Sequence, residues 1–449
     1  MVNTKVEEEH HVLVYGIRLS SVGPGRSTGS DVVHDLSGMD IAMKLHYVKG
    51  VYFFSSQAAQ GLTIARIKES LFHLFCEYYY SCGRLRRTES GRPYIKCNDC
   101  GARFIEAQCD KTVHEWLQMK DSSVQKLLVS QQVIGPDLSF SPTTLIQVTH
   151  FKCGGISLGL SWAHVLGDAL SASNFINKCG QIIASIGSIN MQPNFHSSSG
   201  TSFKHQISKS PAPPLSHGPL SVKQVDPVGD HWITANSCEM DTFSFHVTAA
   251  QLATLQSEIS GQNQTEKMPI FESLCAIIWH SIAKVRRGSI QAEIVTTCKN
   301  DPSAKLAING IVTNTQIIST VKADFPIAET DPKRLVNLLV NEAADERREI
   351  EELVEKDNGL SDFIVYGARL TFVDLEEVDL YGFELNGHKP EFVYYTVQGV
   401  GDEGAVFVLP AGPKGADEGR IVTITLPENQ VPELKVELVK NGLGGHDLA

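Results

Sequence analysis

Hydrophobic and polar positions along this chain follow two periods, one typical of strands and one typical of helices. Four runs in the first half are rich in β-branched and aromatic side chains and have strand length: residues 12–19, 46–54, 143–150 and 155–162. Residues 62–80 instead carry apolar side chains every three or four positions, the spacing that buries one face of a helix. Shorter helices are expected over residues 39–45 and from Asp168 onward.

The second half mixes the same two periods. Strands are expected over residues 241–247, 292–297, 311–318, 392–400, 405–409 and 420–426. Helices are expected over residues 271–285 and 332–356, from Thr248, and after Pro427. The charged residues 345–349 are interpreted as a solvated face of the long helix. Strands and helices intermingled in this way predict an α/β chain with mixed sheets.

The chain is too long for one hydrophobic core. It has 449 residues, and single cores stop growing at about 250–300 residues. Residues 191–224 are rich in serine and proline and show no periodicity, so they are interpreted as an interdomain crossover. The predicted domains are therefore residues 1–190 and residues 225–449.

Charge and hydropathy exclude several classes of partner. The formal net charge is −12, which argues against nucleic acid because phosphates are neutralised by basic faces. The longest apolar runs fall short of the roughly 18–20 residues that span a bilayer, so no transmembrane segment is expected. The acidic residues 1–11 lack the apolar core of a signal peptide, which predicts a cytosolic chain.

One cysteine cluster has two readings. Cys97, Cys100 and Cys109 with His114 resemble a zinc set, but Asn98, Asp99 and Gly101 are typical turn residues. Strand-like residues 92–96 and 103–107 flank them, and a lone Cys-x-x-Cys is a weak metal signal. A hairpin is therefore favoured over zinc, and no metal is expected.

The richest chemistry lies in residues 154–168. A buried strand ends by presenting His164, and Asp168 follows four residues later at the start of a helix. A neutral imidazole in a cleft takes a proton from an alcohol or amine, which contributes about 10²–10⁴-fold to a rate. Asp168 is interpreted as a helix cap and structural support. The pattern alone gives equal weight to His164 as a satisfied core histidine.

Residues 161–168 resemble the His-x-x-x-Asp signature of the plant BAHD acyl-CoA-dependent acyltransferases. Residues 39–47, the Gly-Arg-Leu of residues 83–85 and the Cys97-Asn98 turn resemble further segments of that family. The resemblance implies a two-domain chloramphenicol-acetyltransferase-like fold, with His164 as general base midway along a shared tunnel. It also implies acyl-CoA as ligand or substrate, with no bound cofactor.

The sequence departs from the family pattern at two places. The second signature, Asp-Phe-Gly-Trp-Gly-Lys-Pro, falls on residues 384–390 and keeps only its final Lys-Pro. The degraded donor-channel loop comprises Glu384, Leu385, Asn386, Gly387 and His388. The family also carries an arginine that pairs with the signature aspartate. Here residues 298–300 are Cys-Lys-Asn, so the partner of Asp168 is either Lys299 or absent.

Residues 39–48, 135–138, 151–155 and 386–393 together resemble the Eceriferum/Glossy branch of the family. That branch is linked to cuticular wax and very-long-chain fatty acid elongation. The resemblance implies an accessory that sets product chain length with a 3-ketoacyl-CoA synthase, held by this partner at the cytosolic face of the endoplasmic reticulum. The alternatives are an acyl-CoA-dependent O/N-acyltransferase that uses His164, and a structural adaptor with an empty tunnel.

Overall fold

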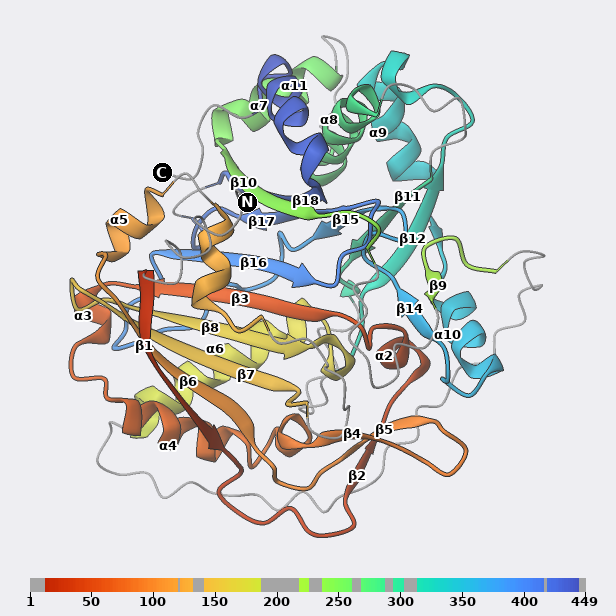
Figure 1. Cartoon of the computed structure of the whole chain (residues 1–449). Coiled ribbons are helices and arrows are strands. Elements are labelled where there is room, and N and C mark those ends of the chain that lie inside the picture. Colours follow the sequence, from red (N-terminus) through yellow and green to blue (C-terminus); the bar gives the residue numbers. More distant parts are fainter. Residues whose placement is uncertain are drawn as a thin grey trace, which may run out of the picture.

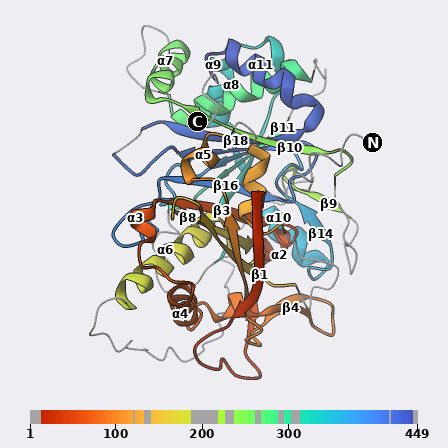
Figure 2. The same ribbon diagram turned by 60° about the vertical axis from the view of Figure 1, so that its left-hand side comes forward.

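The computed structural model describes residues 13–119, 122–131, 141–186, 218–225, 236–260, 268–286, 294–302, 313–415 and 418–443. Two large mixed sheets lie one above the other, and the helices of the second sheet gather on its outer face in both views (Figures 1 and 2). Across the described ranges, no helix combines the length and the apolar character needed to cross a bilayer. The mixed α/β class predicted from the sequence is confirmed.

The first sheet has six strands. Their spatial order is β1 (Val14–Val22), β6 (Ala102–Cys109), β7 (Thr144–Phe151), β8 (Ile156–Ala163), β3 (Tyr47–Phe54) and β16 (Phe392–Gln398). Every residue of β3 and β8 is buried, because both faces of this sheet are covered. Helices α4 (Ile64–Leu74) and α6 (Ala169–Ile186) contribute to the core on one face, and α5 (Val113–Leu117) contributes to a separate core.

The second sheet has seven strands. Their order is β10 (Met240–Val247), β18 (Arg420–Pro427), β17 (Ala405–Pro410), β15 (Leu370–Asp374), β11 (Ile294–Lys299), β12 (Ile317–Lys322) and β13 (Ala344–Asp345). The helices over it are α7 (Ala249–Ser260), α8 (Ile270–Val285), α9 (Pro332–Asn341) and α11 (Val431–Lys440) (Figure 1). They enclose a second core with the outer face of this sheet.

Strand β16 joins the two halves of the chain. It follows β15 in sequence, yet it pairs antiparallel with β3 along its whole length, from Phe392 opposite Phe53 to Gln398 opposite Tyr47. The chain then returns to the second sheet as β17. Residues 191–217 of the expected crossover lie outside the described residues, and its end enters β9 (Lys223–Val225), which pairs with β14 (Asp362–Ile364). The domain boundaries therefore stay a prediction.

A third, small sheet corrects the expected hairpin at Cys97. It consists of β2 (Val33–Asp35), β5 (Pro93–Lys96) and β4 (Arg84–Arg87), with β5 in the centre. The strands that flank the Cys97 turn are β5 and β6, which belong to different sheets and do not pair. The turn is real but is held differently, because the Asp99 carboxylate accepts bonds from the Thr28 amide at 2.8 Å and hydroxyl at 2.6 Å.

The helix expected over residues 62–80 is shorter than predicted. Helix α4 ends at Leu74, and a 3-10 turn over Tyr79–Cys82 follows. Three consecutive tyrosines cannot share one helix face, and here Tyr80 stacks on His34 while Tyr78 packs edge-on against Phe175. Packing of these rings on different partners overrides the helical period.

The prediction of a single helix over residues 332–356 is wrong. Helix α9 ends at Asn341, β13 pairs with β12, and α10 (Arg347–Lys356) begins afterwards. Between them Glu346 is buried rather than solvated. It accepts bonds from the amides of Leu220 and Ser221 at 2.9 and 2.8 Å and from the Thr320 hydroxyl at 2.8 Å. These three donors hold the end of the crossover against β12.

Candidate active site

His164 lies where β8 leaves the first sheet. Its backbone N–H donates to the His46 carbonyl at 2.9 Å, and a single 3-10 turn over His164–Leu166 follows. Gly167 then adopts a φ of 145°, a region that side-chain-bearing residues rarely enter. The Trp162 indole N–H donates to the Gly167 carbonyl at 3.1 Å and closes this corner. The corner fixes His164 with its side chain fully buried between the two sheets.

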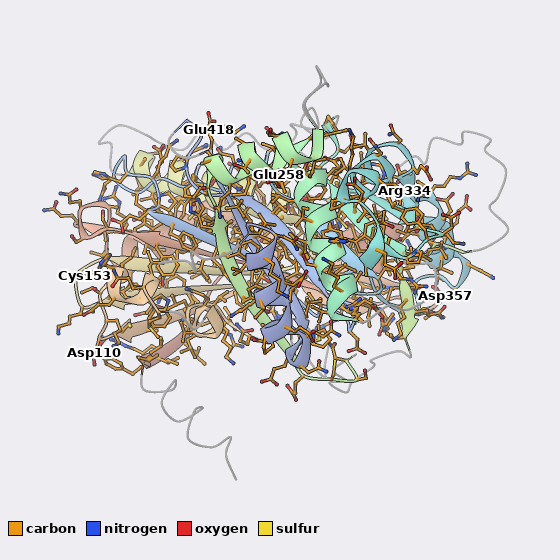
Figure 3. All side chains as sticks on the ribbon, turned by 90° about the horizontal axis from the view of Figure 1, so that it is seen from above. Asp110, Cys153, Glu258, Arg334, Asp357 and Glu418 are labelled. Carbon is orange, nitrogen blue, oxygen red and sulfur yellow. The ribbon has the colours of Figure 1, made fainter. Side chains whose placement is uncertain are left out.

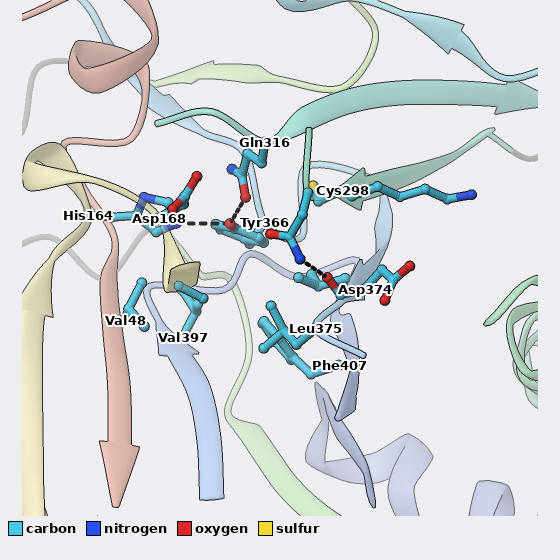
Figure 4. Close-up of a pocket in the computed structure, with 14 residues that line it drawn as sticks. Val48, His164, Asp168, Cys298, Gln316, Tyr366, Asp374, Leu375, Val397 and Phe407 are labelled. Atoms are coloured by element: carbon cyan, nitrogen blue, oxygen red, sulfur yellow. Dashed lines mark hydrogen bonds between the residues drawn. The ribbon is translucent and has the colours of Figure 1, made fainter. Parts of the chain in front are cut away.

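The imidazole of His164 is bonded to a tyrosine from the other sheet. Its Nε2 lies 2.9 Å from the Tyr366 hydroxyl, which donates to Gln316 Oε1 at 2.9 Å (Figure 4). Tyr366 comes just before β15, and Gln316 comes just before β12. The His46 ring packs edge-on against both Tyr366 and His164, with its centroid 5.1 Å from that of Tyr366 and 6.4 Å from that of His164. The site is therefore assembled from both sheets.

Burial determines the ionisation of this cluster. It lowers the pKa of His164, against the opposing attraction of the Asp168 carboxylate. It lowers the pKa of His46 to about 3, with a smaller contribution from His164. Burial also raises the pKa of the Tyr366 phenol well above its ordinary value. At neutral pH the site therefore contains two neutral imidazoles and a protonated phenol.

Asp168 is held without a cationic partner among the described residues. One carboxylate oxygen accepts the Ser171 amide of α6 at 3.0 Å, and the other accepts the amide and the hydroxyl of Thr315 at 2.9 Å each. Lys299, the lysine at the position of the family's arginine, instead pairs with Glu272 and lies over the Phe271 ring. Asp168 thus opens α6 and ties it to the segment before β12.

Residues 313–316 contact the site, although the sequence predicts a strand over residues 311–318, of which 311 and 312 lie outside the described residues. The ladder begins only at Ile317, and the four polar residues before it bond to the site instead. Asn314 donates its side-chain N–H groups to Asp40 and to the His164 carbonyl, both at 2.8 Å. Thr315 holds Asp168, and Gln316 holds Tyr366. Four consecutive polar residues ahead of an apolar run were the available signal.

The cavity beside His164 is small. Its volume is about 10 Å³, which is roughly the space of one water molecule. Its apolar wall includes Val48 and Val397 from the first sheet and Phe407 from the second (Figure 4). At the other end stand Lys299, Asn300 and Asp374. Burial raises the pKa of Asp374 to about 6.

The loop expected to shape the donor channel lies apart from this cavity. None of its five predicted residues lines the 10 Å³ space. Leu385 and His388 exchange backbone hydrogen bonds across a two-residue turn, in which Asn386 and Gly387 have φ of 51° and 76°. The Asn386 amide donates to the carbonyls of Ala58 and Gln60, both at 2.9 Å, at the end of α3 (Ser56–Ala59). Glu384 is exposed. A role in coenzyme A seating stays a prediction.

The cysteines show no metal-like grouping within the described ranges. Cys97 and Cys109 are buried while Cys100 is exposed, and His114 Nε2 is hydrogen-bonded to the Gln118 side chain at 2.8 Å. Burial raises the pKa of the Cys97 thiol to about 12. Cys153 is exposed at the periphery of the molecule (Figure 3), where its sulfur accepts the Val113 amide at 3.5 Å.

Comparison with known proteins places this architecture in a family. A model described as "Transferase family" matches residues 17–300. The chain is 43% identical to Protein ECERIFERUM 26 of Arabidopsis thaliana, over 96% of each chain. It is 44% identical to Protein ECERIFERUM 26-like of the same plant, over 98% of each chain. The crystal structure of vinorine synthase superposes with a TM-score of 0.68 at 16% identity, covering 97% of this chain and 99% of that one.

These matches define a protein of the transferase family with the chloramphenicol-acetyltransferase-like fold. The chain belongs to the BAHD transferase family and lies close to its Eceriferum branch. The family and fold expected from the sequence motifs are thus confirmed.

Proposed function

We propose that this protein is a BAHD-fold accessory of very-long-chain fatty acid elongation for cuticular wax. It acts with a 3-ketoacyl-CoA synthase and sets the length of the acyl product. The observation that carries the proposal is the identity to the Eceriferum proteins, 43–44% over nearly the whole chain. The membrane-bound synthase would hold the chain at the cytosolic face of the endoplasmic reticulum.

The geometry around His164 supports a role without acyl transfer. A general base needs a free nitrogen lone pair and room for the acceptor within about 3 Å. Here Nε2 is already bonded to Tyr366, and the adjacent cavity is about 10 Å³. In this arrangement an alcohol would have to take the place of the Tyr366 hydroxyl at Nε2.

The second candidate is an acyl-CoA-dependent O/N-acyltransferase with His164 as general base. Burial lowers the pKa of His164 and so favours the neutral imidazole that a base requires. Asp168 holds the corner that presents His164. In that function His164 removes the proton of an alcohol or amine, whose oxygen or nitrogen attacks the thioester carbonyl, and the coenzyme A thiolate leaves with a proton.

Two measurements separate these candidates from a structural adaptor. The first is the acyl-chain profile of yeast that expresses a plant 3-ketoacyl-CoA synthase with and without this protein. The accessory predicts longer chains only when both proteins are present. An unchanged profile across several synthases contradicts it.

The second measurement uses the isolated protein with a long-chain acyl-CoA and a simple alcohol. Release of free coenzyme A that depends on the alcohol supports the acyltransferase. Binding without turnover supports the accessory. The adaptor with an empty tunnel predicts neither binding nor turnover, together with association with the synthase in detergent extracts.

A further inference from the structure

Strand β1 carries the two most exposed large apolar side chains in the part of the chain that the structure describes. Ile17 and Leu19 are 59% and 61% exposed. They lie two positions apart and therefore project from one face of the strand. Within the described residues β1 pairs only with β6, so it forms the edge of the first sheet. Both side chains would gain free energy by leaving water for an apolar phase.

Cationic side chains surround this apolar pair. Arg18 lies between the two residues in the strand and is exposed. Arg103 lies at one end of β1, where it pairs with Ser21. Lys111 and Lys152 lie at the other end, where β6 ends beside the start of β1 and the Lys152 amide donates to the Lys111 carbonyl at 3.0 Å. Both lysines are exposed.

The acidic residues of the same region are fewer. They are Glu106, Asp110 and Glu115. The Glu106 carboxylate is ion-paired with Lys68 at 2.8 Å, and the Asp110 carboxylate accepts the Tyr15 hydroxyl at 2.5 Å. The cations that outnumber them are Arg18, Lys68, Arg103, Lys111 and Lys152. The region is therefore locally cationic, although the net charge of the whole chain is −12.

The shape of this edge favours a lipid surface over another strand. The register of β1 with β6 shifts between Tyr15 and Arg18, and Gly16 has a φ of 64° in this bulge. A bulge and a charged side chain on an edge strand both hinder the addition of a further strand. A lipid surface requires no continuous ladder. Apolar side chains flanked by lysine and arginine fit the boundary between acyl chains and acidic headgroups, and the exposed Tyr15 is of a type enriched there.

We propose that the β1 edge, with Ile17 and Leu19 inserted and the surrounding cations on the headgroups, lies on a membrane surface that contains acidic phospholipids. The attachment is weak and reversible, because two apolar side chains and a few cations bind far less tightly than a transmembrane helix. It orients the chain at the membrane without any protein partner. This contact adds to the proposed function, which assigns the membrane location to the synthase alone, and it does not depend on elongation.

The test is flotation of the purified full-length protein with vesicles of phosphatidylcholine, with and without phosphatidylinositol. We expect the parent to float with the acidic vesicles, to float much less with phosphatidylcholine alone, and to be released as the salt concentration rises. The double variant Ile17→Ser with Leu19→Ser should lower the affinity for acidic vesicles about tenfold or more. Arg18→Gln with Arg103→Gln should weaken binding to the acidic vesicles and flatten its salt dependence.

Val436→Ser with Val439→Ser is the matched control. These two side chains of α11 are 57% and 56% exposed, and α11 lies at the top of the molecule while β1 lies in its lower half (Figures 1 and 2). The control should float like the parent, and thermal unfolding checks that each variant is folded.

Three results overturn the proposal. The first is a parent that does not float with acidic vesicles, and the second is an equal loss of binding from the β1 and α11 variants. The third is a change in the oligomeric state of the Ile17 and Leu19 variant with unchanged flotation, which assigns this edge to a second copy of the chain. The test contains no synthase, so its failure is distinct from failure of the proposed function.

Discussion

Asp168 and Thr315 are 147 positions apart in the chain, yet one carboxylate oxygen accepts both the amide and the hydroxyl of Thr315 at 2.9 Å. The other oxygen caps α6 through the Ser171 amide. The aspartate of the His-x-x-x-Asp signature therefore links α6, in the first half of the chain, to the segment that leads into β12. Its structural value does not require any chemistry at His164.

Replacement of Asp168 by alanine should consequently cost much of the protein's stability. Loss of a helix cap and of two buried acceptor bonds predicts a decrease in the free energy of unfolding of about 2–4 kcal/mol. Thr315→Ala removes only the hydroxyl bond and should cost about 1 kcal/mol. Chemical denaturation of both variants measures this. Equal midpoints for Asp168→Ala and the parent would refute the structural role.

Glu346 should hold residues 220 and 221 in place, at the point where the crossover leads into the second half of the chain. In Glu346→Ala the amides of Leu220 and Ser221 and the Thr320 hydroxyl lose their shared acceptor, so we expect about 2–3 kcal/mol of destabilisation. Hydrogen exchange at residues 220 and 221 should accelerate. Glu352→Ala is the control, since Glu352 pairs with Arg348 on the exposed face of α10 and its loss should change stability by less than about 0.5 kcal/mol. Unchanged exchange in Glu346→Ala argues against this anchoring.

Asp374 should make the free energy of unfolding depend on pH, and the raised pKa of this carboxyl sets the sign of the dependence. Burial raises its pKa in the folded chain to about 6 from an ordinary value of 3.8. The folded state then holds the proton more tightly than the unfolded state, so this contribution to stability is present below pH 3.8 and is lost as the pH rises through 6. Asp374→Asn cannot ionise. Its stability relative to the parent should rise between pH 4 and pH 7, as measured by thermal unfolding. A difference that stays constant across this range contradicts the assignment.

Gly387 tests whether the altered second signature is now a structural turn. Its φ is 76°, and a Cβ placed there meets nothing within 4 Å. Gly387→Ala should therefore cost only the backbone strain, about 1–2 kcal/mol. Asn386→Ala should lose the two bonds to the end of α3 as well as a residue suited to positive φ. If neither variant shifts the unfolding midpoint, the turn has no structural importance.

The sequence predicted β3 and β8 of the first sheet well because their runs are buried on both faces and keep one composition throughout. The prediction failed at residues 313–316, where polar residues bond to the site and do not pair with a neighbouring strand. Nothing in a linear pattern showed that Glu346 would interrupt a strongly charged helix to hold residues 220 and 221. His164 and Asp168 were found because they share one short motif. Tyr366, Gln316 and Asn314 come from distant segments, and only the stacking of the two sheets brings them to His164.

The central claim is that this chain alters the acyl-chain length of an elongase without using His164 as a base. The most direct measurement compares the acyl-chain profile of yeast co-expressing a plant 3-ketoacyl-CoA synthase with either the parent or His164→Ala, at matched levels of folded protein. The account predicts the same extension of chain length with both. Extension by the parent that disappears with a well-folded His164→Ala would contradict it and make acyl transfer the function.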